Sequence, residues 1–238
     1  MKTNRTIIVL LAAMLMAACG PNTTVKFSYE HPERYSVGAA TIEQPVNKIS
    51  IDWYNGGVSI RYGDQFRISE ESDSTLTDSL QMRYYLSADG ELEIKFCQSG
   101  SYRNGRLSDI NKMLTIEVPH DANLDEIDID MVGGLITYDS VRCRELSLDV
   151  VNVATTVWTA ALPDEIDVDA VNATVRFYVA PDAGMTIEMD GIKTEFNCEL
   201  PTSKEDDKTI IGDGRCKVDI DAVKGSVYIN KIPEQNQQ

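Results

Sequence analysis

Five aspartates recur at nearly regular intervals in the second half of the sequence, and they are its strongest candidates for a chemical role. Each ends a stretch of alternating apolar and polar residues, a pattern typical of a β-strand with one buried face. If such strands stack in register, the carboxylates form an outward column with neighbours about 4.8 Å apart. The five are Asp130, Asp149, Asp169, Asp190 and Asp221, spaced by 19, 20, 21 and 31 residues.

This column of carboxylates has two interpretations. Each aspartate precedes a tight turn by two residues, so its carboxylate can accept a hydrogen bond from a backbone N–H of that turn. Alternatively, the column binds Ca²⁺, which prefers several carboxylate oxygens as ligands. The sequence lacks the glycine-rich calcium-binding nonapeptide of other β-rolls. We therefore favour the structural interpretation and predict no metal and no cofactor.

Histidine and cysteine chemistry has little support. The sequence contains two histidines, His31 and His120, each beside a proline, and we expect both in surface turns. A Ser-His-Asp or Cys-His site would need one of them. The cysteines after Cys19 show none of the close pairs that bind zinc. They are Cys97, Cys143, Cys198 and Cys216.

Cys198 itself has two interpretations. In the aligned pattern it falls in a column of inward residues between Phe177 and Ile229, which predicts a buried free thiol. Alternatively, a disulfide from Cys198 to Cys216 would close the intervening loop and contribute about 3 kcal/mol. Inward packing and an external bridge are hard to satisfy together, so we favour the buried thiol.

A polysaccharide-active enzyme is the alternative activity to consider. Some β-helices carry out carboxylate catalysis on an outer groove, and a carbohydrate groove needs exposed aromatic rings beside paired carboxylates. Trp53 and Trp158 lie close to the aspartates in the sequence, but we favour outward packing positions under a loop for both. The sequence therefore predicts no catalytic residues and a protein that is not an enzyme.

Three tripeptides resemble an O-glycosylation signal used in the envelope of some bacteria. Each is an aspartate followed by serine and then by threonine, leucine or valine. The acceptor residues that this resemblance implies are Ser74, Ser79 and Ser140.

The amino terminus is a targeting segment. A positively charged start precedes an apolar run at residues 7–16, and Ala17 and Ala18 precede Cys19. This is the pattern of a secretory signal, and the run is too short to span a bilayer, which needs about 20 apolar residues. A cysteine directly after small residues resembles the lipobox of bacterial lipoproteins. The resemblance implies that Cys19 is acylated and becomes the first residue of the mature chain.

These signals divide the chain into a signal peptide at residues 1–18, a lipid-anchored tether at 19–29 and a single domain at 30–238. Gly20 stands where aspartate would imply retention in the inner membrane, and no acidic run follows Cys19. We therefore expect an outer-membrane lipoprotein that faces the periplasm, with exposure on the cell surface as the alternative.

Composition narrows the function classes further. The 238 residues include 22 Lys+Arg and 38 Asp+Glu, for a formal net charge of −16. Nucleic acids and anionic membrane surfaces attract basic proteins, so we exclude binding to either through charge. With 42% hydrophobic residues, the chain has enough apolar material for a packed core.

The elements that position the aspartates are short β-strands. Each copy of the pattern reads as a strand, a tight turn and a second strand, with a period near 20 residues and apolar residues in aligned columns. An earlier copy carries Asp52. Such periodicity predicts an all-β single-stranded β-helix, or solenoid, whose coils bury their inward residues on one another. A β-sandwich of hairpins is the alternative.

Residues 64–113 interrupt the pattern. Alternating residues at 82–86 and 92–96 flank Ala88-Asp89-Gly90, which predicts an inserted β-hairpin because Asp-Gly supplies the positive φ angles of a tight turn.

The segments 51–60, 114–129 and 211–229 resemble the bacterial putative-adhesin solenoid family, a domain of unknown function related to GIN-type adhesin heads. The most distinctive element is Gly212-x-Gly214 before the last copy, and the resemblance covers residues 45–231. It implies a right-handed β-helix that is secreted or attached to the envelope, and it carries over no catalytic residues. Asn152 and Asn172 stand where the family has glycines.

We therefore expect a non-enzymatic cell-envelope lipoprotein that acts as a binding, adhesion or structural module. It would reach the membrane through its lipid and bind an unknown protein or glycan through its surface and projecting loops. An envelope-stress accessory protein is a further alternative.

Overall fold

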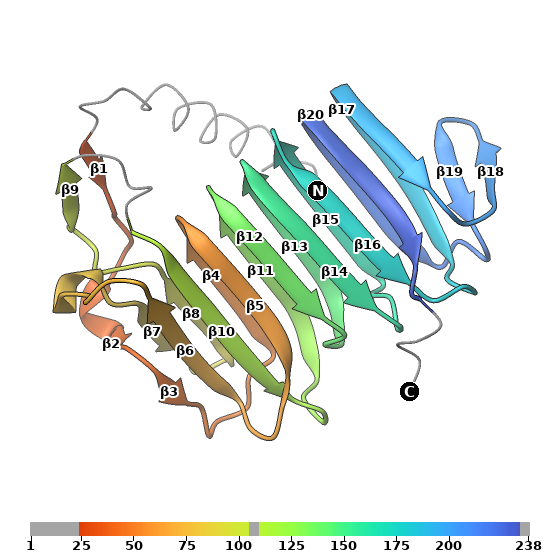
Figure 1. The fold of residues 1–238 in the computed structure, drawn as a ribbon. Helices are drawn as coiled ribbons and strands as arrows, with labels where there is room; N and C mark the ends of the chain where they lie inside the picture. Colours follow the sequence, from red (N-terminus) through yellow and green to blue (C-terminus); the bar gives the residue numbers. More distant parts are fainter. Residues whose placement is uncertain (1–23, 105–109, 234–238) are drawn as a thin grey trace.

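The computed structural model describes residues 24–104 and 110–233, and within them the chain is built from β-strands and two short 3-10 helices (Figure 1). The all-β prediction is confirmed. The predicted signal peptide and Cys19 lie outside the described residues. No helix among the described residues has the length and apolar character needed to cross a membrane.

A first sheet contains the strands that carry the aspartates. Every neighbouring pair in it is parallel, and the register places equivalent residues of the sequence pattern opposite one another, so that Asp130 lies opposite both Asp52 and Asp149. In spatial order the strands are β8 (Glu91–Lys95), β4 (Lys48–Trp53), β11 (Leu124–Met131), β13 (Cys143–Val151), β15 (Glu165–Val171), β20 (Cys216–Lys231) and β17 (Met185–Cys198).

A second sheet contains the strands that follow the turns. All its pairs are parallel except the first, and the long strands β20 and β17 take part in both sheets. In spatial order it consists of β6 (Arg67–Ser72), β10 (Lys112–Pro119), β5 (Gly56–Gly63), β12 (Gly134–Asp139), β14 (Val153–Thr159), β16 (Thr174–Val179), β20 and β17.

The spatial order of the strands departs from the chain order at one end. The sequence pattern suggests that the copy containing Asp221 is last in the stack. In the structure, β20 lies between β15 and β16 on one side and β17 on the other, so Asp190 occupies the last position of the column (Figure 1). β17 therefore forms one end of both sheets.

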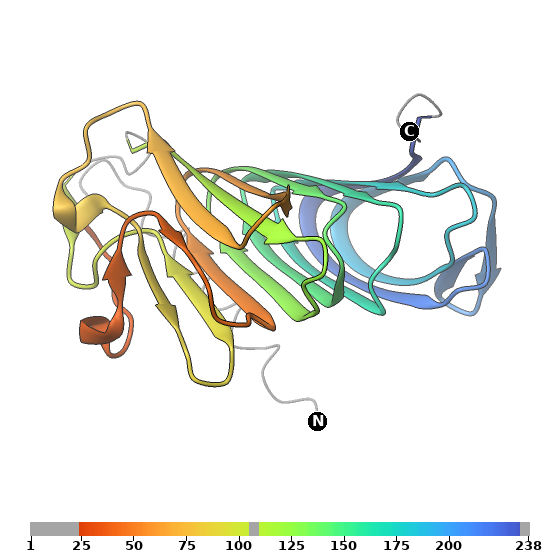
Figure 2. The ribbon, with the colours of Figure 1, turned by 90° about the horizontal axis from the view of Figure 1, so that it is seen from below.

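The two sheets face each other over one hydrophobic core (Figure 2). Inward residues of the first sheet, such as Ile127 and Ile129, belong to the same buried cluster as Ile136 and Tyr138 of the second. The alternation of buried and half-buried residues along the strands is the period of 2 on which the sequence prediction rested. The outer faces of the two sheets consequently lie on opposite sides of the molecule.

The end of the stack opposite β17 is closed by the interrupting segment. The predicted hairpin is confirmed, since β7 (Arg83–Leu86) pairs antiparallel with β8 and Gly90 in the turn has φ of 87°. β8 also pairs in parallel with β4 and so extends the first sheet. The remaining elements here are β1 (Thr24–Lys26), η1 (Pro32–Arg34), β2 (Ser36–Val37), β3 (Ala40–Thr41), η2 (Asp78–Leu80) and β9 (Tyr102–Asn104).

At the β17 end, the loop between β17 and β20 forms a second hairpin. It consists of β18 (Thr202–Glu205) and β19 (Lys208–Ile211), and β19 pairs antiparallel with the first three residues of β17. Part of the loop between Cys198 and Cys216 is therefore a strand pair.

The turns between the two sheets need residues with positive φ. In two copies, glycines provide it: Gly56 has φ of 105° and Gly134 has φ of 120°. Asn152 and Asn172 adopt φ of 57° and 53°, because asparagine tolerates the left-handed conformation better than most residues. Gly134 lies opposite Val153, so the residue with positive φ stands one position earlier in the asparagine copies, and their turns differ in detail from the glycine turns.

Candidate binding face on the second sheet

The outer face of the second sheet combines small polar side chains, aromatic rings and charged side chains of both signs. Its outward residues alternate with buried ones along each strand. Around its centre lie Ser59, Thr137, Thr156, Arg176 and Tyr228 in one row, and Arg61, Asp139, Trp158, Tyr178 and Asn230 in the next. Arg61 forms an ion pair with Glu117 of β10 at 2.9 Å. We call this surface the neutral face.

Two ring contacts stand out on the neutral face. The rings of Trp158 and Tyr178, which lie opposite each other on β14 and β16, stack with centroids 3.9 Å apart and planes 6° apart. The guanidinium of Arg176 lies 4.9 Å from the centre of the Tyr228 ring. Cross-strand aromatic and cation–π contacts of this kind hold large side chains in fixed orientations on an exposed sheet. All four side chains are half-buried.

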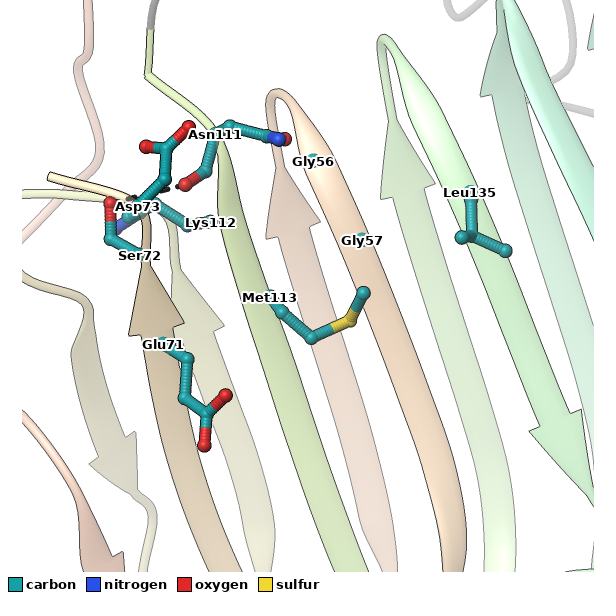
Figure 3. A pocket seen from close by; sticks show the side chains of 9 residues that line it. All are labelled: Gly56, Gly57, Glu71, Ser72, Asp73, Asn111, Lys112, Met113 and Leu135. Carbon is teal, nitrogen blue, oxygen red and sulfur yellow. Dashed lines mark hydrogen bonds between the residues drawn. The ribbon is translucent and has the colours of Figure 1, made fainter.

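A pocket of about 410 Å³ opens at the other end of the neutral face (Figure 3). Glycines make room for it where β5 passes β10: a Cβ added to Gly56 would lie 2.1 Å from the carbonyl oxygen of Lys112. At Gly57 the space is taken by the Met113 side chain, which lies across the strand (Figure 3). The lining residues are Gly56, Gly57, Glu71, Ser72, Asp73, Asn111, Lys112, Met113 and Leu135.

The pocket has an apolar floor and a polar rim. Leu135, with 43% of its surface exposed, and Met113 provide the apolar part. On the rim, the Ser72 hydroxyl donates to the Asn111 carbonyl oxygen at 3.1 Å and accepts the backbone N–H of Ser74 at 3.3 Å. An apolar floor with a few oriented polar groups is the usual composition of a small-molecule site.

A buried cation supports the wall of the pocket from inside. The Lys112 side chain is fully buried, 2.8 Å from a Glu70 carboxylate oxygen, and its ammonium donates to the carbonyl oxygens of Leu80 and Phe96. The ammonium also lies 4.8 Å from the centre of the Trp53 ring. Burial lowers the pKa of Lys112, while the Glu70 carboxylate opposes this effect. The sequence analysis missed this group, although a lysine at an inward position of an alternating strand was a detectable signal.

The two tryptophans take different positions. Trp53 is 2% exposed and points into the core, where its ring meets Phe96 edge-on at 5.0 Å. It therefore cannot line an outer groove. Trp158 faces outward, as expected of a candidate carbohydrate contact, but on the sheet opposite the aspartates. The structure does not bring either tryptophan together with the carboxylate column.

The outer face of the first sheet carries that column. Asp52, Asp130, Asp149, Asp169, Asp221 and Asp190 follow one another in register. Partial burial and the charge of Asp128 raise the pKa of Asp130, and burial raises that of Asp149, which shares hydrogen bonds with Asp130 and Asp169. Burial, followed by the charge of Asp149, raises the pKa of Asp128 to about 6.

At two of the turns, the backbone N–H of the turn asparagine has a partner other than the aspartate three residues before it. The turn N–H of Asn152 donates to the carbonyl oxygen of Val171, and that of Asn172 donates to Val223, each on the neighbouring strand. The partners of the Asp149 carboxylate are instead the adjacent carboxyl groups. Within 24–104 and 110–233, no group of three His, Cys, Asp or Glu side chains is arranged to hold a metal ion. Calcium binding by the column stays the alternative prediction.

The histidines and cysteines form no shared site. His31 is exposed beside Glu33, and exposed His120 stacks on the Tyr62 ring at 4.2 Å. Cys97, Cys143, Cys198 and Cys216 are free thiols, and burial raises the pKa of Cys97 to about 12.

The position of Cys198 corrects both interpretations of it. Cys198 lies opposite Ile229, whereas Cys216 lies opposite Met185, at the other end of the same strand pair, so no disulfide joins them. Cys198 faces inward as predicted, but it is half-buried and not buried. The reason is that β17 is an end strand, so a neighbouring strand, β20, covers Cys198 on one side only.

The predicted modification residues are spread over the surface. Ser74 is exposed beside the pocket rim, where its hydroxyl donates to Asp73 at 3.2 Å. Ser140 is exposed after β12, with φ of 61°. Ser79 is half-buried in η2. Glycosylation at these positions stays a prediction.

Comparisons with known proteins identify the fold. No family model matches the sequence, and no curated protein sequence matches it. A crystal structure of a putative cell adhesion protein from Clostridium sporogenes superposes with a TM-score of 0.61 at 15% identity, covering 83% of this chain and all of that one. A putative adhesin from Bacteroides fragilis aligns over 84% of this chain and 98% of its own, at 12% identity and a TM-score of 0.35. The first likeness shows a shared fold.

Proposed function

We propose that this chain is a non-enzymatic lipoprotein of the cell envelope that binds a glycan through the neutral face of its second sheet. The observation that carries the proposal is the unequal distribution of charge between the two outer faces. The first sheet presents in-register carboxylates, whereas the second presents hydroxyl groups, stacked aromatic rings and the pocket.

The chemistry of the neutral face suits a chain of neutral sugars. Sugar hydroxyls can pair with the hydroxyl groups of Thr137 and Thr156 and with the amide of Asn230, and apolar sugar faces pack on the faces of aromatic rings. The carboxylates on the opposite side, together with a net charge of −16, disfavour an anionic polymer. A protein ligand is the alternative, and the binding assay below distinguishes the two.

Two observations support the envelope location: the sequence of the amino-terminal segment and the description of a protein with a similar fold. The lipobox-like segment ending at Cys19 supports acylation and anchoring in the outer membrane, facing the periplasm. The Clostridium sporogenes protein of similar fold is described as a putative cell adhesion protein, which agrees with an adhesion role. We further infer a right-handed solenoid, supported by the parallel in-register stacking of strands in both sheets.

The absence of catalysis is part of the proposal. A glycosidase needs two carboxyl groups on either side of one bond, next to rings that hold the sugar. Here the outward tryptophan and the carboxylate column lie on opposite sheets. This separation of Trp158 from the column supports a binding role for the neutral face.

Affinity electrophoresis of the full chain in gels that contain soluble envelope polysaccharides tests the proposal. We expect retardation by at least one neutral polysaccharide, and loss of most of it in Trp158→Ala and Tyr178→Ala. The matched control is Tyr85→Ala, which removes a half-buried ring from β7, away from the neutral face. Equal binding by all three variants would contradict the proposal, and binding to envelope proteins alone would favour a protein ligand.

A further inference from the structure

One edge of β17 is largely open. On one side the strand pairs with β20 from Met185 to Cys198, but on the other side β19 pairs only with Met185 to Ile187. Among the residues that the structure describes, no strand pairs with positions 188–198 along this edge (Figure 1). Such an edge presents backbone N–H and C=O groups that can template pairing with another strand.

The core is also incompletely covered at this end. Met189, Phe196 and Cys198 face inward but are half-buried, whereas their register partners on β20 are at most 2% exposed. Those partners are Ile220, Val227 and Ile229. Ile192, at the turn of β17, is 66% exposed, the most of any large apolar side chain in the described ranges. This end therefore presents both unpaired backbone and apolar surface.

We propose that a second copy of this chain covers this end, with the two β17 strands paired antiparallel about a two-fold axis near their turns. A two-fold contact uses the same patch on both copies and closes without forming a fibre. β17 has two arms, one before its turn in the first sheet and one after its turn in the second sheet. In an antiparallel pair, the first arm of one copy pairs with the second arm of the other, so the first sheet of each copy continues into the second sheet of the other.

The geometry of the edge restricts the register of this pairing. The inward residues of both copies must face the same core. The inward positions on the first arm of one copy must therefore lie opposite the inward positions on the second arm of the other copy. Ile187 is already paired with Thr209 of the β19 hairpin, so it is not available to a second copy. The next inward residue is Met189, which then lies opposite Cys198 of the second copy.

The closed opposite end of the stack favours this arrangement over head-to-tail stacking of two copies. There β7 already pairs along β8, so the edge of β8 is not open to β17 of a second copy. In the two-fold register, Asp190 lies opposite Asn197 of the second copy, whose amide can donate to the carboxylate. Glu188 lies opposite Glu199 of the second copy, and the ion pair of Glu188 with Lys208 offsets this contact between like charges. The net charge of −16 on each copy opposes association at long range, so we expect tighter association at higher salt.

Sedimentation equilibrium of the full chain at low and high salt tests the pairing. We expect dimers, stronger at high salt, and a dissociation constant raised about tenfold or more by Ile192→Glu. That side chain is exposed, so folding is unaffected, and the register places it opposite Glu195 of the second copy. The matched control is Val223→Glu on β20, directly beside Ile192 but away from the edge, which we expect to leave the dimer intact.

A cross-linking experiment tests the register. Met189→Cys should form a disulfide with Cys198 of the second copy on mild oxidation, which yields a covalent dimer, whereas Val223→Cys should not. A chain that sediments as a monomer at every salt concentration overturns the proposal, as does equal weakening by both glutamate variants. A dimer without the Met189→Cys cross-link overturns the register.

Discussion

Replacing Asp128 with asparagine should make the protein more stable at neutral pH. The carboxyl group lies half-buried on β11, and its pKa is raised from 3.8 to about 6, first by burial and then by the charge of Asp149. The folded state therefore binds this proton more tightly than the unfolded state does. The stability that this proton confers is complete below pH 3.8 and is lost as the pH rises through about 6.

The size of the effect follows from the two pKa values. The difference between 3.8 and about 6 corresponds to about 3 kcal/mol above pH 7, and screening by solvent reduces this to about 1–2 kcal/mol. Asparagine keeps the shape of the side chain and removes its charge. For a chain of this size, the gain amounts to a rise in Tm of about 2–8 °C at pH 7.5.

Thermal unfolding followed by circular dichroism between pH 4.5 and 8, at low salt, measures this effect. We expect the Tm of the wild type to fall with rising pH across this range, and that of Asp128→Asn to fall less. Asp125→Asn, on the same strand but with an exposed side chain beside Arg144, serves as the matched control and should change stability little. Loss of stability in Asp128→Asn at pH 7.5 would refute the reasoning.

Three further variants test other features. Thr155→Val should raise the free energy of unfolding by about 1 kcal/mol in chemical denaturation, because the fully buried Thr155 hydroxyl has no hydrogen-bond partner among the residues that the structure describes. Lys224→Asn should also raise it by about 1 kcal/mol, because Lys224 is exposed and holds φ of 56°, which asparagine adopts more readily; an unchanged denaturation midpoint would show that the turn is unstrained. Cys19→Ala should move the protein from the membrane fraction to the soluble fraction and abolish acylation, and an unacylated variant that stays in the membrane would contradict lipid anchoring.

Short-range patterns in the sequence were sufficient to predict the strands and the direction in which most side chains point. Alternation with a period of 2 assigns residues such as Ile127 and Ile129 to one face wherever a strand has one buried side. The Asp-Gly turn predicted the β7–β8 hairpin for an equally local reason, because few residues accept the positive φ that Gly90 adopts. The outward column of aspartates followed from the same alternation.

The candidate sites depended on contacts that no local pattern encodes. The sequence placed Trp53 among possible outer residues, but the strand register puts it in the core beside Phe96. The pocket arises where β5, β6, β10 and β12 come together from distant parts of the chain. Lys112 is buried because Glu70, from another strand, compensates its charge.

The order of strands at the β17 end was decided by tertiary structure alone. The copies of the pattern have similar apolar columns, so their sequences fit several neighbours about equally well, and local preference does not select among them. The β18–β19 hairpin allows the chain to return and place β20 between β16 and β17. As a result, Asp190 and Cys198 lie on an end strand and have a neighbouring strand on one side only. The alignment of the copies had predicted neighbouring strands on both sides.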